Sequence, residues 1–292
     1  MDTGPEAAAL DSLVVSGIGC AVNLPCSSTA YLRTPKNRKF MGNQDHLAVT
    51  AAGRALQTAA LNSTMLGSNA GLFLAVGFIP FERADIDALT ESSLEDGHIS
   101  YRRFGTKSFG AVNPLLTFRC LPNMPAYHIS ANFDVQGEYF VTYPGAGQFY
   151  LALQEGIDAL NAGRIQIALV GAVADQTNFL VSHHFQRLRP PVPSTALRDG
   201  AGFLVIETTR ANLARKGPIR ARLRSFKTGY QAHDSFQTEF SHTESFEGCP
   251  EPEGLFGAAS LPVALASFRP AHVRHELRAR DGISGHSSWG IF

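Results

Sequence analysis

The segment from Glu138 to Gly171 constrains the fold more than any other part of the sequence, because it holds three elements in immediate succession. EYFVTY (138–143) has the composition of a strand, PGAG (144–147) that of a tight turn, and QFYLALQEGIDALNAG (148–163) places apolar residues on one helical face. IQIALVG (165–171) is a second apolar strand. Two continuous apolar strands joined by a helix imply a parallel pairing of the strands in a sheet that is covered on both sides. We therefore expect an α/β layered fold.

Shorter apolar runs elsewhere extend this architecture. The first of them ends in the pair Gly17 and Gly19, which predicts a turn, but no third glycine follows at the spacing of a dinucleotide-binding loop. A polar stretch at 82–107 is expected to form a mobile surface insertion rather than a core element. Strands are predicted at 13–19, 71–78, 200–207, 219–226 and 287–292, and helices at 45–61 and 257–268.

The composition favours a well-buried globular protein and argues against polyanionic partners. Apolar residues make up 44% of the 292 residues, and 25 basic residues balance 25 acidic ones, so no long-range field attracts nucleic acid or an anionic membrane. The N-terminal stretch lacks the features of a leader, and no apolar run reaches the length of a membrane span. The wide cysteine spacing suits neither a zinc site nor a dense disulfide framework. We expect a cytoplasmic protein with no nucleic-acid partner, no membrane span and no metal.

The turn PGAG (144–147), called the elbow below, raises the question of function. A bend between a strand and a helix presents the nucleophile in many enzymes, yet none of these four residues carries an attacking atom. In an arbitrary α/β protein, such a turn would simply join two elements. The sequence on both sides of the elbow is what gives it a functional interpretation.

Motifs along nearly the whole chain carry a resemblance to a known family. They are LVVSGIG (13–19), NPLLTFRCLPNMPAYHISANFDVQG (113–137), LRDGAGFLVIET (197–208), ARKGPIRARLRSF (214–226) and DGISGHSSWGIF (281–292). In these segments the chain resembles β-ketoacyl synthases, which extend acyl chains carried on acyl carrier protein, and their catalytically inactive partners, the chain-length factors. The resemblance implies a thiolase-like layered fold in a single domain of residues 1–292. The N-terminal half (about 11–208) is expected to be complete and the C-terminal half (about 209–292) to be shortened.

The departures from the family pattern carry the functional prediction. The family's elbow runs approximately V-S-T-A-C-A-S-G, which places Gly145 at the position of the nucleophilic cysteine. EGLFGAAS (253–260) places Gly254 where an active-site histidine precedes a helix, and no HGT motif for the second histidine is found. Ile283 stands where the family commonly has a gating phenylalanine. Because covalent condensation needs a thiolate, the resemblance implies a chain with no catalytic residues and no cofactor.

An inactive chain of this kind would act through a partner. In the family the strand before the elbow pairs antiparallel with its counterpart in a second subunit, and EYFVTY keeps the character that such pairing needs. The resemblance implies a chain-length-factor-like subunit that forms a heterodimer with an active β-ketoacyl-ACP synthase, works with acyl carrier protein and shapes the acyl cavity. It is most similar to partner subunits from aryl polyene and related bacterial polyene, polyketide or fatty-acid-like biosynthesis. The candidates for cavity or interface are Phe140, Tyr143, Pro144, Gln148, Phe149, Tyr150 and Ile283.

Several of these residues also fit simpler roles. Ordinary core packing explains Phe140, Phe149 and Tyr150 as well as an acyl tunnel does. Gln148 lies three positions beyond the cysteine position, so it is better explained as a residue that satisfies backbone donors at a helix start.

Two other functions stay open. One is an independent acyl-transfer or malonyl-decarboxylating enzyme with relocated catalytic residues, for which Tyr143, Cys120 and His128 are the groups to test. The other is a homodimeric acyl-binding protein with no synthase partner.

Other polar residues have weaker functional interpretations. The pairs His183 with His184 and His272 with His275 have metal-ligand spacing, but no matching carboxylates or cysteines accompany them, which favours surface or core histidines. Four basic residues are candidates for docking an acidic carrier protein, although solvated arginines are the default interpretation. They are Arg187, Arg189, Lys216 and Arg220.

Overall fold

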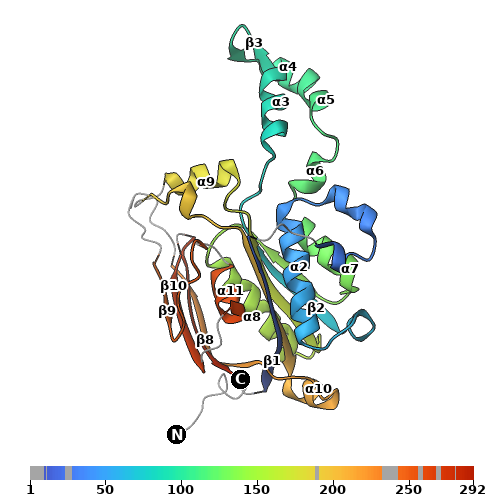
Figure 1. The fold of residues 1–292 in the computed structure, drawn as a ribbon, viewed down its shortest axis with the longest axis vertical. Helices are drawn as coiled ribbons and strands as arrows, with labels where there is room; N and C mark the ends of the chain where they lie inside the picture. The colour runs from blue at the N-terminus through green and yellow to red at the C-terminus, as the bar shows by residue number, and fades with distance from the viewer. Residues whose placement is uncertain are drawn as a thin grey trace.

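One mixed sheet of nine strands organises the part of the chain that the structure describes (Figure 1). The structure is a computed structural model, and it describes residues 10, 12–23, 28–187, 191–231, 243–255, 259–267, 271–279 and 281–292. Helices pack on this sheet, which confirms the predicted α/β layered fold. In spatial order the strands are β5 (Tyr139–Thr142), β2 (Ala70–Val76), β6 (Ile167–Ala174), β7 (Gly200–Thr208), β1 (Leu13–Val22), β8 (Ala221–Tyr230), β11 (Ile283–Ile291), β10 (His272–Arg278) and β9 (Thr243–Glu247).

The N-terminal half of the sheet consists of β5, β2, β6, β7 and β1. β2 pairs in parallel with β5 on one side and with β6 on the other, whereas β7 runs antiparallel to both β6 and β1. β5 and β6 run parallel, as predicted, but the predicted pairing of these two strands is wrong, because β2 lies between them. A helix is about 10 Å wide, roughly twice the spacing of neighbouring strands, so the helix that connects β5 to β6 can cross one intervening strand.

The turn predicted at Gly17 and Gly19 is wrong, because β1 continues through both glycines to Val22. A Cβ atom at either glycine would overlap the backbone of helix α2 (Asn43–Thr58) at Ala55. The two glycines therefore allow α2 to lie directly on the strand, which is a packing role and not a turn.

Helices cover both faces of the N-terminal half of the sheet. α2 packs on one face with α7 (Met124–Phe133) beside it, and α8 (Gln148–Asn161) packs on the other with α11 (Ser260–Ser267). Figure 1 shows α8 and α11 between this half and the strands β8 to β11. Because both faces are covered, every residue of β2 and β6 is buried.

The remaining helices are short. No helix in the described ranges is both long enough and apolar enough to cross a membrane. The short α-helices of the body are α9 (Phe179–Gln186) and α10 (Thr209–Ala214), and its short 3₁₀ helices are η1 (Ser28–Tyr31), η2 (Pro35–Phe40), η3 (Ser63–Met65) and η5 (Ser194–Ala196).

β8, β11, β10 and β9 form the C-terminal half of the sheet, and all of them pair antiparallel. One residue pair, Val15 with Ala221, joins this half to β1. The inner side chains, such as Val273 and Trp289, are buried, whereas the outer side chains of β10 are polar and exposed. Among the described elements no helix packs on the outer face (Figure 1). β9 and β10 were not predicted from the sequence.

The polar stretch at 82–107 lies in an arm that extends away from the body of the molecule (Figure 1). It is at the surface, as predicted, and it is built of regular structure. The arm exposes large apolar side chains, since Tyr101 and Phe109 are 88% and 68% exposed. Its elements are α3 (Arg83–Ser93), β3 (Leu94–Glu95), β4 (His98–Ile99), α4 (Tyr101–Arg103), the π-helical η4 (Phe104–Ser108), α5 (Phe109–Ala111) and, near the body, α6 (Leu116–Arg119).

Candidate functional site

The elbow lies between the end of β5 and the start of α8, and its backbone suits only glycine at one position. Gly145 has φ +143°, a conformation that L side chains rarely adopt. A Cβ atom built there would also overlap Oδ2 of Asp281. The position that the resemblance assigns to a nucleophilic cysteine therefore has neither the side chain nor the space for one.

Asp281 fills this space and binds the elbow through several hydrogen bonds. One of its carboxylate oxygens accepts from the Gly147 N–H at 3.2 Å and from Nε2 of Gln148 at 3.1 Å, and the other accepts from the Ile283 N–H at 3.2 Å. The hydroxyl of Thr142 donates to Oε1 of Gln148 and thereby fixes the side-chain amide. A carboxylate at the start of α8 is also favoured by the helix dipole. The chain segment before β11 is thus held onto the elbow.

A hollow of about 510 Å³ lies next to this contact. Two of the predicted cavity residues, Gln148 and Ile283, line it. Ile283 itself is only 5% exposed, and its side chain occupies the space that a side chain at Gly147 would need. The full lining is Gln148, Leu151, Thr228, Gly229, Tyr230, Asp281 and Ile283.

The other cavity or interface candidates lie in different surroundings. Phe149 and Tyr150 are each 1% exposed in the main core, and Phe140 is partly buried against the same core. Tyr143 is 40% exposed and Pro144 is half-buried. None of these five side chains lines the hollow.

Tyr150 belongs to a buried polar network that the sequence did not reveal. Its hydroxyl lies 2.7 Å from Nδ1 of His275 and 3.0 Å from Oγ of Ser287. His275 in turn places Nε2 2.8 Å from a carboxylate oxygen of Glu244, which also accepts from Ser260. Burial raises the pKa of Tyr150 well above its ordinary value, so the phenol stays protonated. His275 is therefore a core histidine.

Gly254 occupies the position at which the resemblance places an active-site histidine. It lies against the segment that leads into β7. Its carbonyl accepts from the Arg198 N–H at 3.0 Å and from Nε2 of Gln176 at 2.9 Å, and its φ of +75° again favours glycine. A Cβ atom there would overlap the carbonyl oxygen of Ala196. A histidine at this position would have to displace that backbone.

The three residues of the independent-enzyme hypothesis lie in separate environments. His128 is fully buried in α7, neither of its ring nitrogens has a hydrogen-bond partner among the described residues, and burial lowers its pKa to about 4. Burial raises the pKa of the Cys120 thiol to about 11, so the thiolate is disfavoured at neutral pH. Tyr143 lies at the elbow. No contact within the described ranges joins any two of the three.

The predicted metal and docking residues do not gather into one site. His184 packs against Phe78, with ring centroids 4.7 Å apart, and the described residues contain no group of three or more metal-ligating side chains. Arg187 follows α9, whereas Lys216 follows α10, and Figure 1 places these two helices at opposite ends of the body. Arg187 and Lys216 therefore lie at different ends of the body, and a role of these basic residues in docking a carrier protein stays a prediction. Arg189 lies outside the described residues.

Comparison with known proteins settles the family. The sequence model of the N-terminal domain of β-ketoacyl synthases matches residues 26–205, a range that includes the elbow and most of the N-terminal half of the sheet. The chain belongs to the β-ketoacyl synthase family. The predicted resemblance is thereby confirmed. No curated protein matches the sequence.

Solved structures of ketosynthases share the fold at low sequence identity. A chain from a structure described as a type II polyketide synthase acyl-carrier protein in complex with its ketosynthase bound to the hexaketide matches with a TM-score of 0.60 and 15% identity, over 75% of this chain and 69% of that chain. The ishigamide ketosynthase/chain length factor matches with a TM-score of 0.56 and 19% identity, over 75% of this chain and 63% of that chain. A β-ketoacyl synthase from Burkholderia phymatum matches with a TM-score of 0.55 and 17% identity, over 77% of this chain and 66% of that chain. This β-ketoacyl synthase family member thus spans about two thirds of the length of these ketosynthases.

Proposed function

We propose that this chain is a non-catalytic, chain-length-factor-like subunit that pairs with an active β-ketoacyl-ACP synthase. The observation that carries the proposal is the elbow, where Gly145 replaces the nucleophile and the Asp281 carboxylate occupies the space beside it. In this role the partner supplies the thiolate and histidines for decarboxylative condensation of substrates delivered by acyl carrier protein. The present chain stabilises the partner and bounds its acyl cavity in polyene, aryl polyene, polyketide or fatty-acid-like biosynthesis.

The electrostatics of the elbow also oppose condensation on this chain. An active elbow must accept an acyl group on sulfur and then admit a malonyl group, which carries a carboxylate. Here Asp281 already accepts a hydrogen bond from the Gly147 N–H, a donor within the elbow. Its negative charge repels a second carboxylate at short range. The elbow therefore lacks a nucleophile, and the Gly147 N–H is already occupied by the Asp281 carboxylate.

The strand before the elbow supports pairing with a second subunit. β5 is at one edge of the nine-stranded sheet and pairs only with β2 within the described residues. Its first residue, Tyr139, is 71% exposed. An edge strand with an exposed aromatic side chain presents unpaired backbone groups that a neighbouring strand can bind.

The independent-enzyme alternative has less support in the geometry. Tyr143, Cys120 and His128 do not meet, and burial holds the thiol and the imidazole in their neutral forms. The homodimer alternative uses the same edge strand, because β5 could pair with a second copy as well as with a synthase. Partner choice therefore has to be measured.

The deciding experiment is native mass spectrometry of this chain expressed with and without a ketosynthase from the same source. We expect a one-to-one complex whose condensation of acyl and malonyl carrier proteins is lost when the partner's cysteine is replaced. Activity should persist when Tyr143 of this chain is replaced by phenylalanine. Condensation by the purified chain alone, or a stable homodimer that does not bind the synthase, would contradict the proposal.

A further inference from the structure

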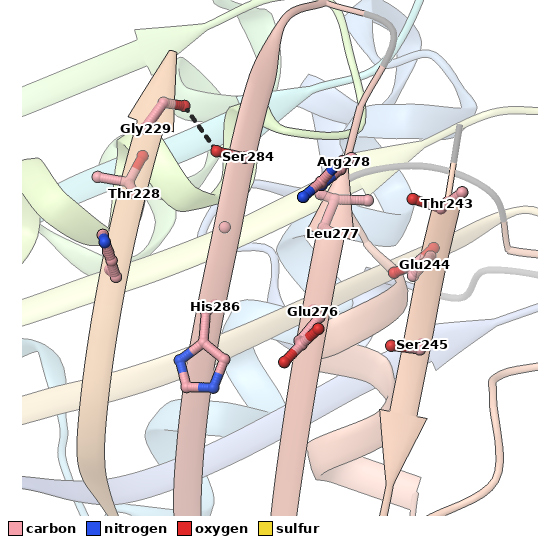
Figure 2. A pocket seen from close by; sticks show the side chains of 12 residues that line it. Thr228, Gly229, Thr243, Glu244, Ser245, Glu276, Leu277, Arg278, Ser284 and His286 are labelled. Atoms are coloured by element: carbon pink, nitrogen blue, oxygen red, sulfur yellow. Dashed lines mark hydrogen bonds between the residues drawn. The ribbon is translucent and has the colours of Figure 1, made fainter. Parts of the chain in front are cut away.

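The outer face of the C-terminal half of the sheet is a broad polar surface. Its outward-pointing residues form rows across the strands, so that Lys227 on β8 lies opposite His286 on β11, and His286 lies opposite Glu276 on β10. Ser284 and Arg278 form the next row. Figure 2 labels His286, Glu276, Ser284 and Arg278, which line a shallow hollow. The volume of this hollow is about 390 Å³. We call this surface, formed by the outward residues of β8, β11, β10 and β9, the outer sheet face.

Positive charge predominates on the outer sheet face, although the whole chain has no net charge. Its basic side chains are Arg222, Arg224, Lys227, Arg274 and Arg278, and its acidic side chains are Glu247 and Glu276.

Ion pairing leaves most of this positive charge available. Arg274 pairs with Glu247 at 3.2 Å, whereas Arg224, Lys227 and Arg278 form no ion pair within the described residues. Glu276, the other carboxylate of the face, lies in the same row as Lys227 and two residues from Arg278 on β10. Unpaired like charges repel one another, and an anionic partner would relieve that repulsion.

The geometry of the face suits a helix. Antiparallel sheets often leave one face in water, so the exposure of the outer sheet face does not by itself indicate a binding surface. In this molecule, however, helices cover both faces of the N-terminal half of the sheet and, among the described elements, only the inner face of the C-terminal half. Four strands span roughly 15 Å, wide enough for one helix of about 10 Å diameter.

We propose that the outer sheet face docks an acidic helix of a partner protein. The helix would complete a layer that the described chain does not supply, and its carboxylates would pair with Lys227, Arg278 and Arg224. The polar rows exclude an apolar partner helix, and the excess of cations excludes a basic one. The inference does not depend on the proposed function, because it uses neither the elbow nor the edge strand.

The test uses a defined acidic probe on the full-length chain. A fluorescein-labelled, Glu-rich helical peptide of about 18 residues is titrated by fluorescence anisotropy, together with the same peptide carrying Gln in place of Glu. The double variant Lys227→Glu, Arg278→Glu reverses two cations on the face. The matched control, Lys36→Glu with Arg210→Glu, makes the same charge change at two exposed residues of other elements. Circular dichroism checks the fold of each variant.

We expect the Glu peptide to bind the wild type with an affinity that falls as salt is added, and the Gln peptide not to bind. The face variant should bind at least about tenfold more weakly, a difference of about 1.4 kcal/mol, and the control variant should bind like the wild type. If charge reversal unfolds the chain, Lys227→Gln with Arg278→Gln should weaken binding in the same direction. Equal binding by the face and control variants, no binding by the wild type, or tighter binding of a DNA duplex would overturn the proposal.

Discussion

The hydroxyl of Tyr150 lies 2.7 Å from Nδ1 of His275, and this contact joins helix α8 to strand β10. The two rings are nearly parallel, with centroids 5.8 Å apart. Because both side chains are 1% exposed, water cannot replace the hydrogen bond if either partner is lost. The contact therefore couples the helix that begins at the elbow to the C-terminal half of the sheet.

Replacing Tyr150 by phenylalanine should destabilise the protein while preserving its packing. The ring would still stack, but Nδ1 of His275 and Oγ of Ser287 would lose a partner. We expect a loss of about 1–3 kcal/mol in the free energy of unfolding, measured by urea denaturation. Tyr139→Phe, at a 71% exposed position, serves as the control and should change stability by less than about 0.5 kcal/mol. Equal effects of the two substitutions would rule out a structural role for the network.

Installing a cysteine at Gly145 should destabilise the chain rather than restore catalysis. The new side chain must adopt φ +143° and overlap Asp281. We expect a loss of roughly 1–3 kcal/mol from the backbone conformation alone, with a further loss from the overlap. In a double-mutant cycle, Asp281→Ala should cost less in the Gly145→Cys background than in the wild type, because part of the overlap is then relieved. Strict additivity of the two substitutions would show that the carboxylate does not occupy the elbow.

Asp45→Asn should stabilise the protein at alkaline pH and leave it unchanged in acid. Burial raises the pKa of Asp45 from 3.8 to about 7, so the folded state holds a proton that the unfolded chain has released. Stability therefore falls as pH rises from about 4 to about 7, with a slope of at most about 1.4 kcal/mol per pH unit. Asparagine can still accept from the Gly42 N–H, at 2.7 Å from Oδ2 in the wild type, but cannot ionise.

Urea denaturation at a series of pH values checks this expectation. The variant and the wild type should converge near pH 4 and diverge up to pH 8. His128, whose Nε2 lies 3.9 Å from Oδ2 of Asp45, is present in both proteins, so its own titration largely cancels in the difference. A difference that does not change with pH would mean that Asp45 is ionised in the folded state throughout.

Tyr139→Glu should weaken assembly with a ketosynthase partner without unfolding the chain. A charge on the exposed edge of β5 opposes strand addition, because it must be desolvated when the edge is covered. We expect at least about a tenfold weaker complex by native mass spectrometry or sedimentation. Leu213→Glu places the same charge at a 64% exposed apolar position in α10, far from β5 in sequence, and should leave assembly unchanged. Unchanged assembly of the β5 variant would remove the edge strand from the interface.

Local sequence patterns predicted the segment around the elbow well. The strand, turn and helix from 138 to 163 appear as β5, the elbow and α8, because apolar spacing and turn residues act within a few positions of each other. The pattern could not place β2 between β5 and β6, since that arrangement depends on pairing between distant segments. For the same reason, Gly17 and Gly19 gave a false turn signal: their role is contact with α2, about 40 residues away.

The most informative contacts of the site were also the least predictable. Asp281 binds Gly147 across 134 residues, and no local pattern distinguishes it from a surface aspartate. β10 was missed because a buried histidine, His275, interrupts the alternation of apolar and polar residues that signals a strand. Its burial is tolerated because Tyr150 and Glu244 satisfy both ring nitrogens, and Glu244 lies in a strand that was also missed.

The single residue pair between β1 and β8 determines where the sheet would separate during partial unfolding. Among the described residues, Val15 and Ala221 form the only registered pair that connects the two halves of the sheet, whereas every other junction between neighbouring strands has several. Amide groups in β9, β10 and β11 should therefore exchange with deuterium through a smaller, separate unfolding event than those in β2 and β6. The C-terminal half would then behave as its own cooperative unit, able to detach and re-form while the N-terminal half keeps its protection.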